Sequence, residues 1–223
     1  MTKLEIYMDF KSPYAFIAKD ANYALEEEFG IEIDWYPLTL NIKSYLGSAK
    51  KEAGKIVESN RSSTQWLAVK YAYMDARRYA SLRNLTLKGT EKIWDSSIAG
   101  IAMLWAKRQG RVITKRFIDL TYESFWKREL DIEDVEIVKN TLLSAGADIR
   151  GFLDFVKVEG REIHDSLQNE ILEKGYYGVP SYVIDDEVYF GREHLPRVRW
   201  HLQGCIGDFP DIAYDSVLGD SHA

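Results

Sequence analysis

Hydrophobic and polar positions over the first forty residues predict a strand, a helix and a second strand. Apolar side chains alternate with polar ones over residues 4–10 and again over residues 31–36, which is the two-residue period of a strand. Between these runs, apolar residues recur at helical spacing. Ser12 and Pro13 form a helix-start signal, and Gly30 ends the helix. Because a helical crossover joins strands that run in the same direction, we expect a parallel β-α-β unit.

Residues 41–175 follow a different pattern, which predicts a mostly helical segment. The segment contains no proline, and apolar residues recur along most of it at intervals of three and four. Residues 41–60 show no clear period. We expect irregular structure there, with one helix at most.

Strand patterns return near the C-terminus. Residues 181–184 and 187–190 are short strand-like runs, and Asp185 and Asp186 between them are a turn signal. A helix over about residues 193–203 follows, which completes a β-β-α unit.

These units in this order are typical of an α/β thioredoxin-like fold that is interrupted by a large helical insertion. We therefore assign residues 1–40 and 176–203 to a thioredoxin-like domain. Residues 41–175 form the helical insertion, and residues 204–223 form a C-terminal tail with loose structure.

The composition is that of an ordinary globular protein, with 46% hydrophobic and 29% charged residues. A formal net charge of -6 argues against a general nucleic-acid binder, which needs a basic surface. No apolar run approaches the ~20 residues of a membrane span, and no apolar signal core precedes the first strand. We therefore expect a cytoplasmic protein that contacts neither nucleic acid nor membrane.

The cysteine and histidine content excludes further chemistry. Cys205 is the single cysteine, so the chain cannot run dithiol–disulfide chemistry by itself, nor form a cysteine-based zinc site. No His-x-x-x-His or His-Glu-x-x-His pair is present, and we predict no metal site. We expect surface or helix positions for the four histidines, His164, His194, His201 and His222.

Residues 9–14, Asp-Phe-Lys-Ser-Pro-Tyr, place the hydroxyl of Ser12 where the first strand joins the first helix. A helix start offers unpaired backbone N–H groups and the positive end of the helix dipole, which stabilise an anion such as a thiolate. In dithiol oxidoreductases this location carries a reactive cysteine. The alternative is that Ser12 serves only as a helix N-cap.

Two more motifs lie near the C-terminus. In Gly178-Val179-Pro180, a proline that begins a strand can take a cis peptide bond and expose the preceding backbone to an extended ligand; it can equally be a simple strand breaker. In residues 190–196, Glu193 either binds an ammonium group or caps its own helix.

Together, these motifs resemble the 2-hydroxychromene-2-carboxylate isomerases and kappa-class glutathione transferases, relatives of the DsbA-type thioredoxin-fold proteins. In the middle of the chain, residues 58–61 and 70–74 are similar to that family's Gly-Asn-x-Pro-Pro … Lys-x-x-Tyr stretch, with Ser62 and Ser63 in place of the proline pair. The resemblance covers about residues 4–203.

The resemblance implies a glutathione site. Ser12 would hydrogen-bond the glutathione sulfur and favour its thiolate. Val179, before a cis Pro180, would pair its backbone with the cysteinyl part of glutathione. Glu193 would hold the γ-glutamyl ammonium group.

The middle motif adds two residues to that implied site. Asn60 and Lys70 match positions that help to form it, and Lys70 is suited to a carboxylate.

The expected activity is a glutathione-dependent isomerase that acts on an aromatic or conjugated-carbonyl small molecule. A kappa-class-like glutathione transferase is the first alternative. The second, of a different class, is a DsbA-like peptide-binding or chaperone-type protein without redox cysteines. By analogy with its relatives, we expect a homodimer.

Overall fold

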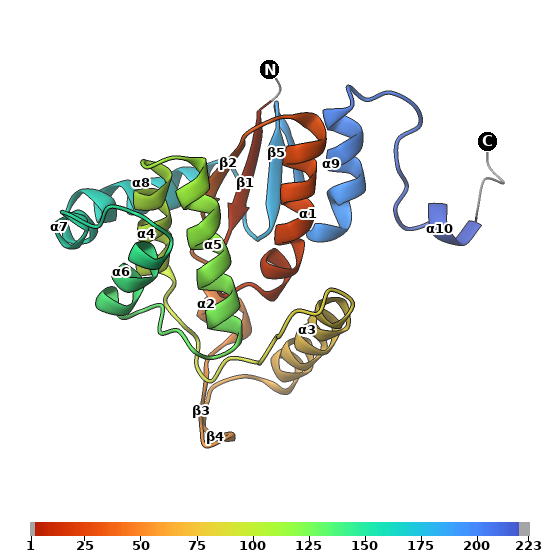
Figure 1. Ribbon diagram of the computed structural model, residues 1–223. Coiled ribbons are helices and arrows are strands. Elements are labelled where there is room, and N and C mark those ends of the chain that lie inside the picture. The colour runs from red at the N-terminus through yellow and green to blue at the C-terminus, as the bar shows by residue number, and fades with distance from the viewer. Residues whose placement is uncertain (1–2, 219–223) are drawn as a thin grey trace.

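The computed structural model describes residues 3–218 and is built around a four-stranded mixed sheet (Figure 1). The strands lie in the order β2-β1-β5-β6. Their bounds are β1 Leu4–Met8, β2 Ile33–Pro37, β5 Ser181–Ile184 and β6 Glu187–Phe190. β1 is parallel to β2, whereas β5 is antiparallel to both β1 and β6. The parallel β-α-β unit and the terminal hairpin are therefore confirmed.

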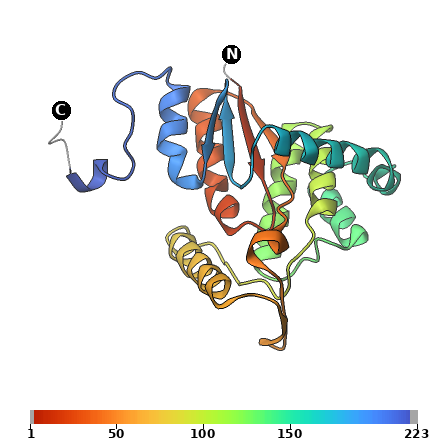
Figure 2. The same ribbon diagram turned by 180° about the vertical axis from the view of Figure 1, so that it is seen from behind.

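The helix α1, Pro13–Phe29, joins β1 to β2 and has the ends that the sequence predicts. The Ser12 hydroxyl oxygen accepts a hydrogen bond from the backbone N–H of Ala15 at 3.3 Å, and Gly30 leaves the helix in the left-handed conformation at φ 59°. Both α1 and α9, Leu195–Leu202, lie on one face of the sheet, so that the strands stand in front of them when the molecule is seen from behind (Figure 2).

The insertion contributes most of the remaining helices. They are α2 Ile42–Leu46, α3 Ser63–Ser81, α4 Ser97–Lys107, α5 Arg111–Trp126, α6 Val135–Ser144, α7 Phe152–Lys157 and α8 Glu159–Glu173. A short 3-10 helix, η1 Arg192–His194, precedes α9, and α10, Asp215–Leu218, lies in the tail.

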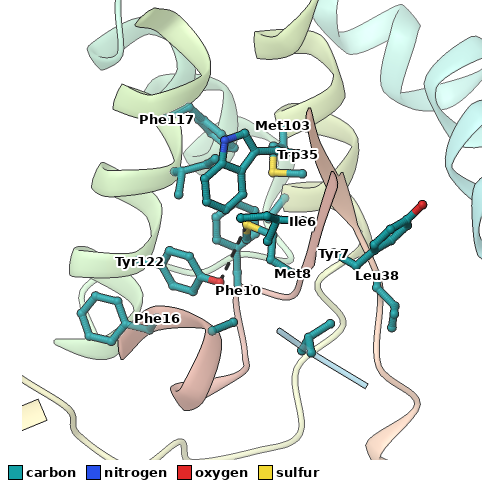
Figure 3. Packing of buried hydrophobic residues seen from close by; sticks show 14 of the residues in the cluster. Ile6, Tyr7, Met8, Phe10, Phe16, Trp35, Leu38, Met103, Phe117 and Tyr122 are labelled. Atoms are coloured by element: carbon teal, nitrogen blue, oxygen red, sulfur yellow. Dashed lines mark hydrogen bonds between the residues drawn. The ribbon is translucent and has the colours of Figure 1, made fainter. Parts of the chain in front are cut away.

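A row of buried aromatic rings packs the insertion against the thioredoxin part (Figure 3). The ring of Phe10 lies 5.9 Å from that of Phe117 and 5.1 Å from that of Tyr122, while Phe16 stacks on Tyr122 at 5.4 Å. The Tyr122 hydroxyl donates to the backbone oxygen of Asp9 at 3.1 Å. Because α5 thus packs directly on the β1–α1 junction, the insertion supports the place where Ser12 lies.

Residues 41–60 hold more regular structure than the sequence indicates. Besides α2, they form a hairpin of β3, Ala49–Glu52, and β4, Lys55–Ser59. Its turn residues Ala53 and Gly54 both have positive φ, 47° and 79°, as two-residue hairpin loops require. The side chains of β4 are all exposed, so no apolar alternation marks the strand in the sequence. The segment 41–175 is therefore helical with a two-stranded sheet inside it.

The predicted tail is described as far as residue 218, and residues 219–223, with His222, lie outside the described part. Its first residues contact α9: Phe209 packs edge-on against Trp200 at 5.2 Å, and Arg197 donates to the backbone oxygen of Pro210. Across residues 3–218, no helix is long and apolar enough to cross a membrane.

The buried carboxylate of Glu26 connects α1, β2 and α5, so its removal should lower the stability of the fold. The Glu26 side chain is fully buried; it accepts from the backbone N–H of Ile33 at 3.1 Å and pairs with Arg111 and Lys115 at 3.0 Å each. Replacement Glu26→Ala should lower the free energy of unfolding by about 3 kcal/mol, because it leaves a buried donor and two cations without their partner. Urea denaturation measures the change.

Glu28 provides the matched control, since it lies on the same helix but pairs with Arg199 at the surface. Glu28→Ala should unfold at nearly the same urea concentration as the wild type. A Glu26→Ala variant with the wild-type midpoint would contradict the assigned role.

Candidate functional site

A cavity of about 790 Å³ opens beside the start of α1. The β1–α1 turn, the loop after β2, α2, α3 and the end of α8 contribute to its walls. Both Ser12 and Val179 line it, although they are 167 positions apart in the sequence. The structure therefore brings two of the predicted site residues into one cavity.

Ser12 is both an N-cap and a cavity residue. Its oxygen accepts the Ala15 N–H, and the residue is 5% exposed. A hydroxyl has one donor and two acceptor positions, so the cap bond leaves its O–H able to donate to a ligand in the cavity. The capping role and a ligand-binding role are compatible.

The Val179–Pro180 peptide bond is cis, and Val179 lines the cavity. The loop is held on both sides: the Ser181 hydroxyl donates to the backbone oxygen of Gly178 at 2.7 Å, and the N–H of Gly191 donates to that of Pro180 at 2.9 Å. Pro180 thus immediately precedes β5, and its cis bond is the one that the first of the two sequence interpretations expects.

Lys11 is a cavity residue for which the sequence analysis gave no role. Its ammonium group is buried, lies 3.0 Å from the Asp9 carboxylate and donates to the Ser96 hydroxyl at 2.9 Å. In the sequence, its position next to Ser12 in the first motif could have indicated that Lys11 lies at the site. The Asp9 carboxylate balances the charge of this ammonium group, and the buried ion pair lies beside the start of α1.

Asn60, Lys70 and Glu193 are not among the residues that line this cavity. The Asn60 side chain accepts from the backbone N–H of Ser48 at 2.6 Å and so ties the hairpin to the turn after α2. Their roles toward glutathione stay predictions.

The helical phase of α3 explains the position of Lys70. Val69, Ala72 and Tyr73 face the cavity, whereas Lys70 and Tyr71 are exposed. A lysine one position away from the inward face points to solvent.

Arg61, which follows Asn60, does line the cavity. Its Nε atom is buried and has no hydrogen-bond partner, its guanidinium lies 5.0 Å from the Trp66 ring, and burial lowers its pKa. Together with Lys11 and Lys92, it makes three cationic side chains in a wall to which the described residues contribute no aspartate or glutamate. Lys11 pairs with Asp9 and Lys92 with Glu133, so Arg61 is the cation that favours an anionic ligand in this cavity.

Aromatic rings complete the walls. The Lys92 ammonium group lies 4.2 Å above the Trp94 ring, and Tyr177 packs against Phe190 at 4.8 Å. Seven aromatic residues face the cavity: Tyr14, Tyr45, Tyr73, Trp94, Tyr176, Tyr177 and Phe190. A planar, unsaturated ligand suits these surfaces.

The remaining candidates lie elsewhere, with one exception. Cys205 is exposed after α9 and lines a different pocket, together with His194 and His201. His164 is buried in α8 and contacts Thr39, which lines the main cavity. Within residues 3–218, no group of three His, Cys, Asp or Glu side chains is placed to hold a metal ion.

Known proteins are similar to this chain along nearly its whole length. A 2-hydroxychromene-2-carboxylate isomerase of Sphingobium xenophagum is 24% identical over 204 residues, which cover 91% of this chain and 99% of the relative. The isomerase of the same name from Pseudomonas sp. (strain C18) is 23% identical, with 93% and 91% covered.

Solved structures share the fold. A 2-hydroxychromene-2-carboxylate isomerase (HCCA isomerase) superposes with a TM-score of 0.68 at 18% identity, covering 91% of this chain and 95% of that one. The cytosolic disulfide reductase DsbM from Pseudomonas aeruginosa, solved with GSH, gives 0.57 at 13% identity, with 92% and 98% covered.

These findings confirm the thioredoxin-like fold and the resemblance to the isomerases that the terminal motifs indicated. Residues 3–203 match the family model of the DSBA-like thioredoxin domain, and the chain therefore belongs to the DSBA-like thioredoxin domain family.

Proposed function

We propose that this protein is a glutathione-dependent isomerase of the 2-hydroxychromene-2-carboxylate type. The observation that carries the proposal is the shared cavity. It combines a serine at a helix start, a residue that precedes a cis-proline, cationic side chains and aromatic walls. The curated relatives that match along nearly the whole chain are isomerases of that name, which supports the reaction class.

The residues present fit glutathione. Val179 lines the cavity in the loop before β5, where its backbone groups can pair with an extended peptide as those of a strand would. Lys11, which lines the cavity and pairs with Asp9, offers a cation for one of its carboxylates. When bound, glutathione supplies a thiolate for reversible addition to a conjugated double bond.

Ser12 would favour the charged form of the sulfur. A free thiol has a pKa of about 8.5, so it is mostly protonated at neutral pH. The Ser12 oxygen already accepts the Ala15 N–H, so its own O–H is directed to donate rather than accept. Donation to an anion and the positive end of α1 both lower a thiol pKa.

The guanidinium of Arg61 would bind a carboxylate. It is the only one of the three cavity cations without an ion pair among the described residues, since Lys11 pairs with Asp9 and Lys92 with Glu133. An arginine matches a carboxylate with two parallel hydrogen bonds. An aromatic acid therefore satisfies both the charge and the aromatic walls of the cavity.

The first prediction from the proposed function concerns Ser12. Titration calorimetry should detect glutathione binding to the wild type. Ser12→Ala should raise the pKa of the bound thiol by about one unit, which is about 1.4 kcal/mol, and lower isomerase kcat by about tenfold or more. The ultraviolet absorbance of the thiolate as a function of pH measures the pKa. Absence of binding at millimolar glutathione would exclude the proposed function.

Ser62→Ala is the matched control, because Ser62 is the N-cap of α3 and lies outside the cavity lining. Each alanine replacement should cost about 1 kcal/mol of stability through the lost cap. The change in thiol pKa should appear only in Ser12→Ala. Equal effects of both variants would assign Ser12 a capping role alone.

The second prediction separates Arg61 from Lys70. Arg61→Met should raise the KM for a carboxylate substrate by about 10- to 100-fold, since a hydrogen bond to a charged group is worth about 1.5–3 kcal/mol. Lys70→Met should leave the KM for that substrate within about twofold, because Lys70 is exposed outside the cavity. Steady-state kinetics of both variants measures the two KM values. A larger increase of KM in Lys70→Met than in Arg61→Met would identify Lys70 as the carboxylate-binding residue.

Conjugates released during turnover would indicate a transferase. Peptide binding without any effect of glutathione would indicate a binding module.

A further inference from the structure

A hydroxyl, an imidazole and a carboxylate lie in line beside the main cavity. In α8, His164 is 3% exposed, and its Nε2 atom lies 2.9 Å from the Thr39 hydroxyl oxygen. Its Nδ1 atom lies 2.9 Å from the Asp165 carboxylate. Thr39 lines the cavity, whereas the Asp165 side chain is 59% exposed. The row therefore runs from the cavity through a buried ring to the protein surface.

Hydrogen bonds to one carboxylate, that of Asp9, connect the loop of Thr39 with the turn that carries Ser12. Its N–H donates to the Gln168 side chain at 2.8 Å, and the next N–H, of Leu40, donates to the Asp9 carboxylate at 2.8 Å. That carboxylate also accepts from the N–H of Lys11, the residue before Ser12. One buried side chain thus fixes the loops that carry both hydroxyls.

The surroundings of His164 favour the neutral ring. Burial is the main cause that lowers its pKa; Arg161 acts in the same direction, whereas Asp165 and Asp95 raise it. From α4, Gly100 packs against the ring edge. In the neutral form, Nδ1–H donates to Asp165, and Nε2 accepts from the Thr39 hydroxyl.

We propose that Thr39 is the proton-transfer residue of the isomerase. In this proposal, His164 accepts the proton of Thr39, and Asp165 orients the His164 ring. This inference rests on the proposed function. The substrate in the name of the similar isomerases, 2-hydroxychromene-2-carboxylate, carries a hydroxyl group on a ring carbon. Thr39 accepts the proton of that hydroxyl while its own proton moves to His164 Nε2. The imidazolium that forms is stabilised by Asp165.

The electrons and atoms balance within the substrate. As the hydroxyl O–H bond breaks, its electron pair forms the carbonyl bond, and the ring C–O bond breaks with its pair left on the ring oxygen. The proton then returns from His164 through Thr39 to that oxygen. The relay ends as it began, and substrate and product are isomers.

A purely structural role for the row would be to fasten α8 to the loop after β2. Gln168 already does this, because it accepts from the Thr39 N–H and donates to the backbone oxygen of Pro37 at 2.9 Å. Gln168→Met is therefore a matched control that loosens the same contact without removing a group able to carry a proton.

The test uses 2-hydroxychromene-2-carboxylate as substrate at saturating glutathione. Thr39→Val should lower kcat by about 100-fold, and Thr39→Ser should restore most of it. Glutathione Kd, measured by calorimetry, should stay within about twofold in both. In the wild type, kcat should fall as the pH drops below the pKa of His164, because a protonated ring accepts no proton from Thr39. His164→Gln should lower kcat and leave only the part of the acidic limb that follows the pKa of the bound glutathione thiol, which ultraviolet absorbance measures separately. Gln168→Met should retain the complete wild-type pH dependence.

Two results would overturn the relay alone: Thr39→Val with wild-type kcat, or a His164→Gln variant whose kcat depends on pH in the same way as that of the wild type. A wild type that neither binds glutathione nor turns over the substrate would overturn the proposed function and the relay together.

Discussion

The buried carboxylate of Asp9 is the interaction on which the site depends. It accepts from the backbone N–H groups of Lys11 and Leu40 and pairs with the Lys11 ammonium group. Removing a carboxylate from water costs several kcal/mol, which these partners must offset together. Because it holds the start of α1 and the loop after β2 in one arrangement, the residues on both sides of the cavity are positioned before any ligand binds.

Local patterns were sufficient for the thioredoxin part of the fold. Strand alternation, the Ser12-Pro13 start and Gly30 each report on neighbouring residues, and the structure has the elements that they predict. The hairpin within residues 41–60 was missed because its strands face solvent, where no apolar period is needed. Its turn conformation, at Ala53 and Gly54, depends on backbone dihedrals that composition indicates only weakly.

The site was harder to predict because it is assembled over long sequence separations. The row from Thr39 to His164 joins residues 125 positions apart, and neither side chain belongs to a local motif. Motif matching selected Asn60, whereas the next residue, Arg61, lines the cavity. A shift of one position changes which way a side chain points, and a motif without backbone geometry does not resolve it.

The single cysteine excludes a dithiol–disulfide pair within this chain, although its fold is shared with a disulfide reductase. Cys205 is exposed beyond α9, and a hydroxyl occupies the helix start. On the proposed function, the reactive sulfur arrives with a diffusible peptide, so the protein itself needs no redox partner to be regenerated.

On the proposed function, α3 shapes the cavity but carries none of the residues proposed for the chemistry. In both ribbon views this helix lies below the sheet (Figures 1 and 2). Its Val69 and Ala72 side chains line the cavity. Lys70 and Tyr71 on its other side are exposed, whereas the inner side forms part of the cavity wall. On the proposed function, a few replacements on this one helix can therefore change the substrate, while the Asp9 carboxylate and the start of α1 stay unchanged.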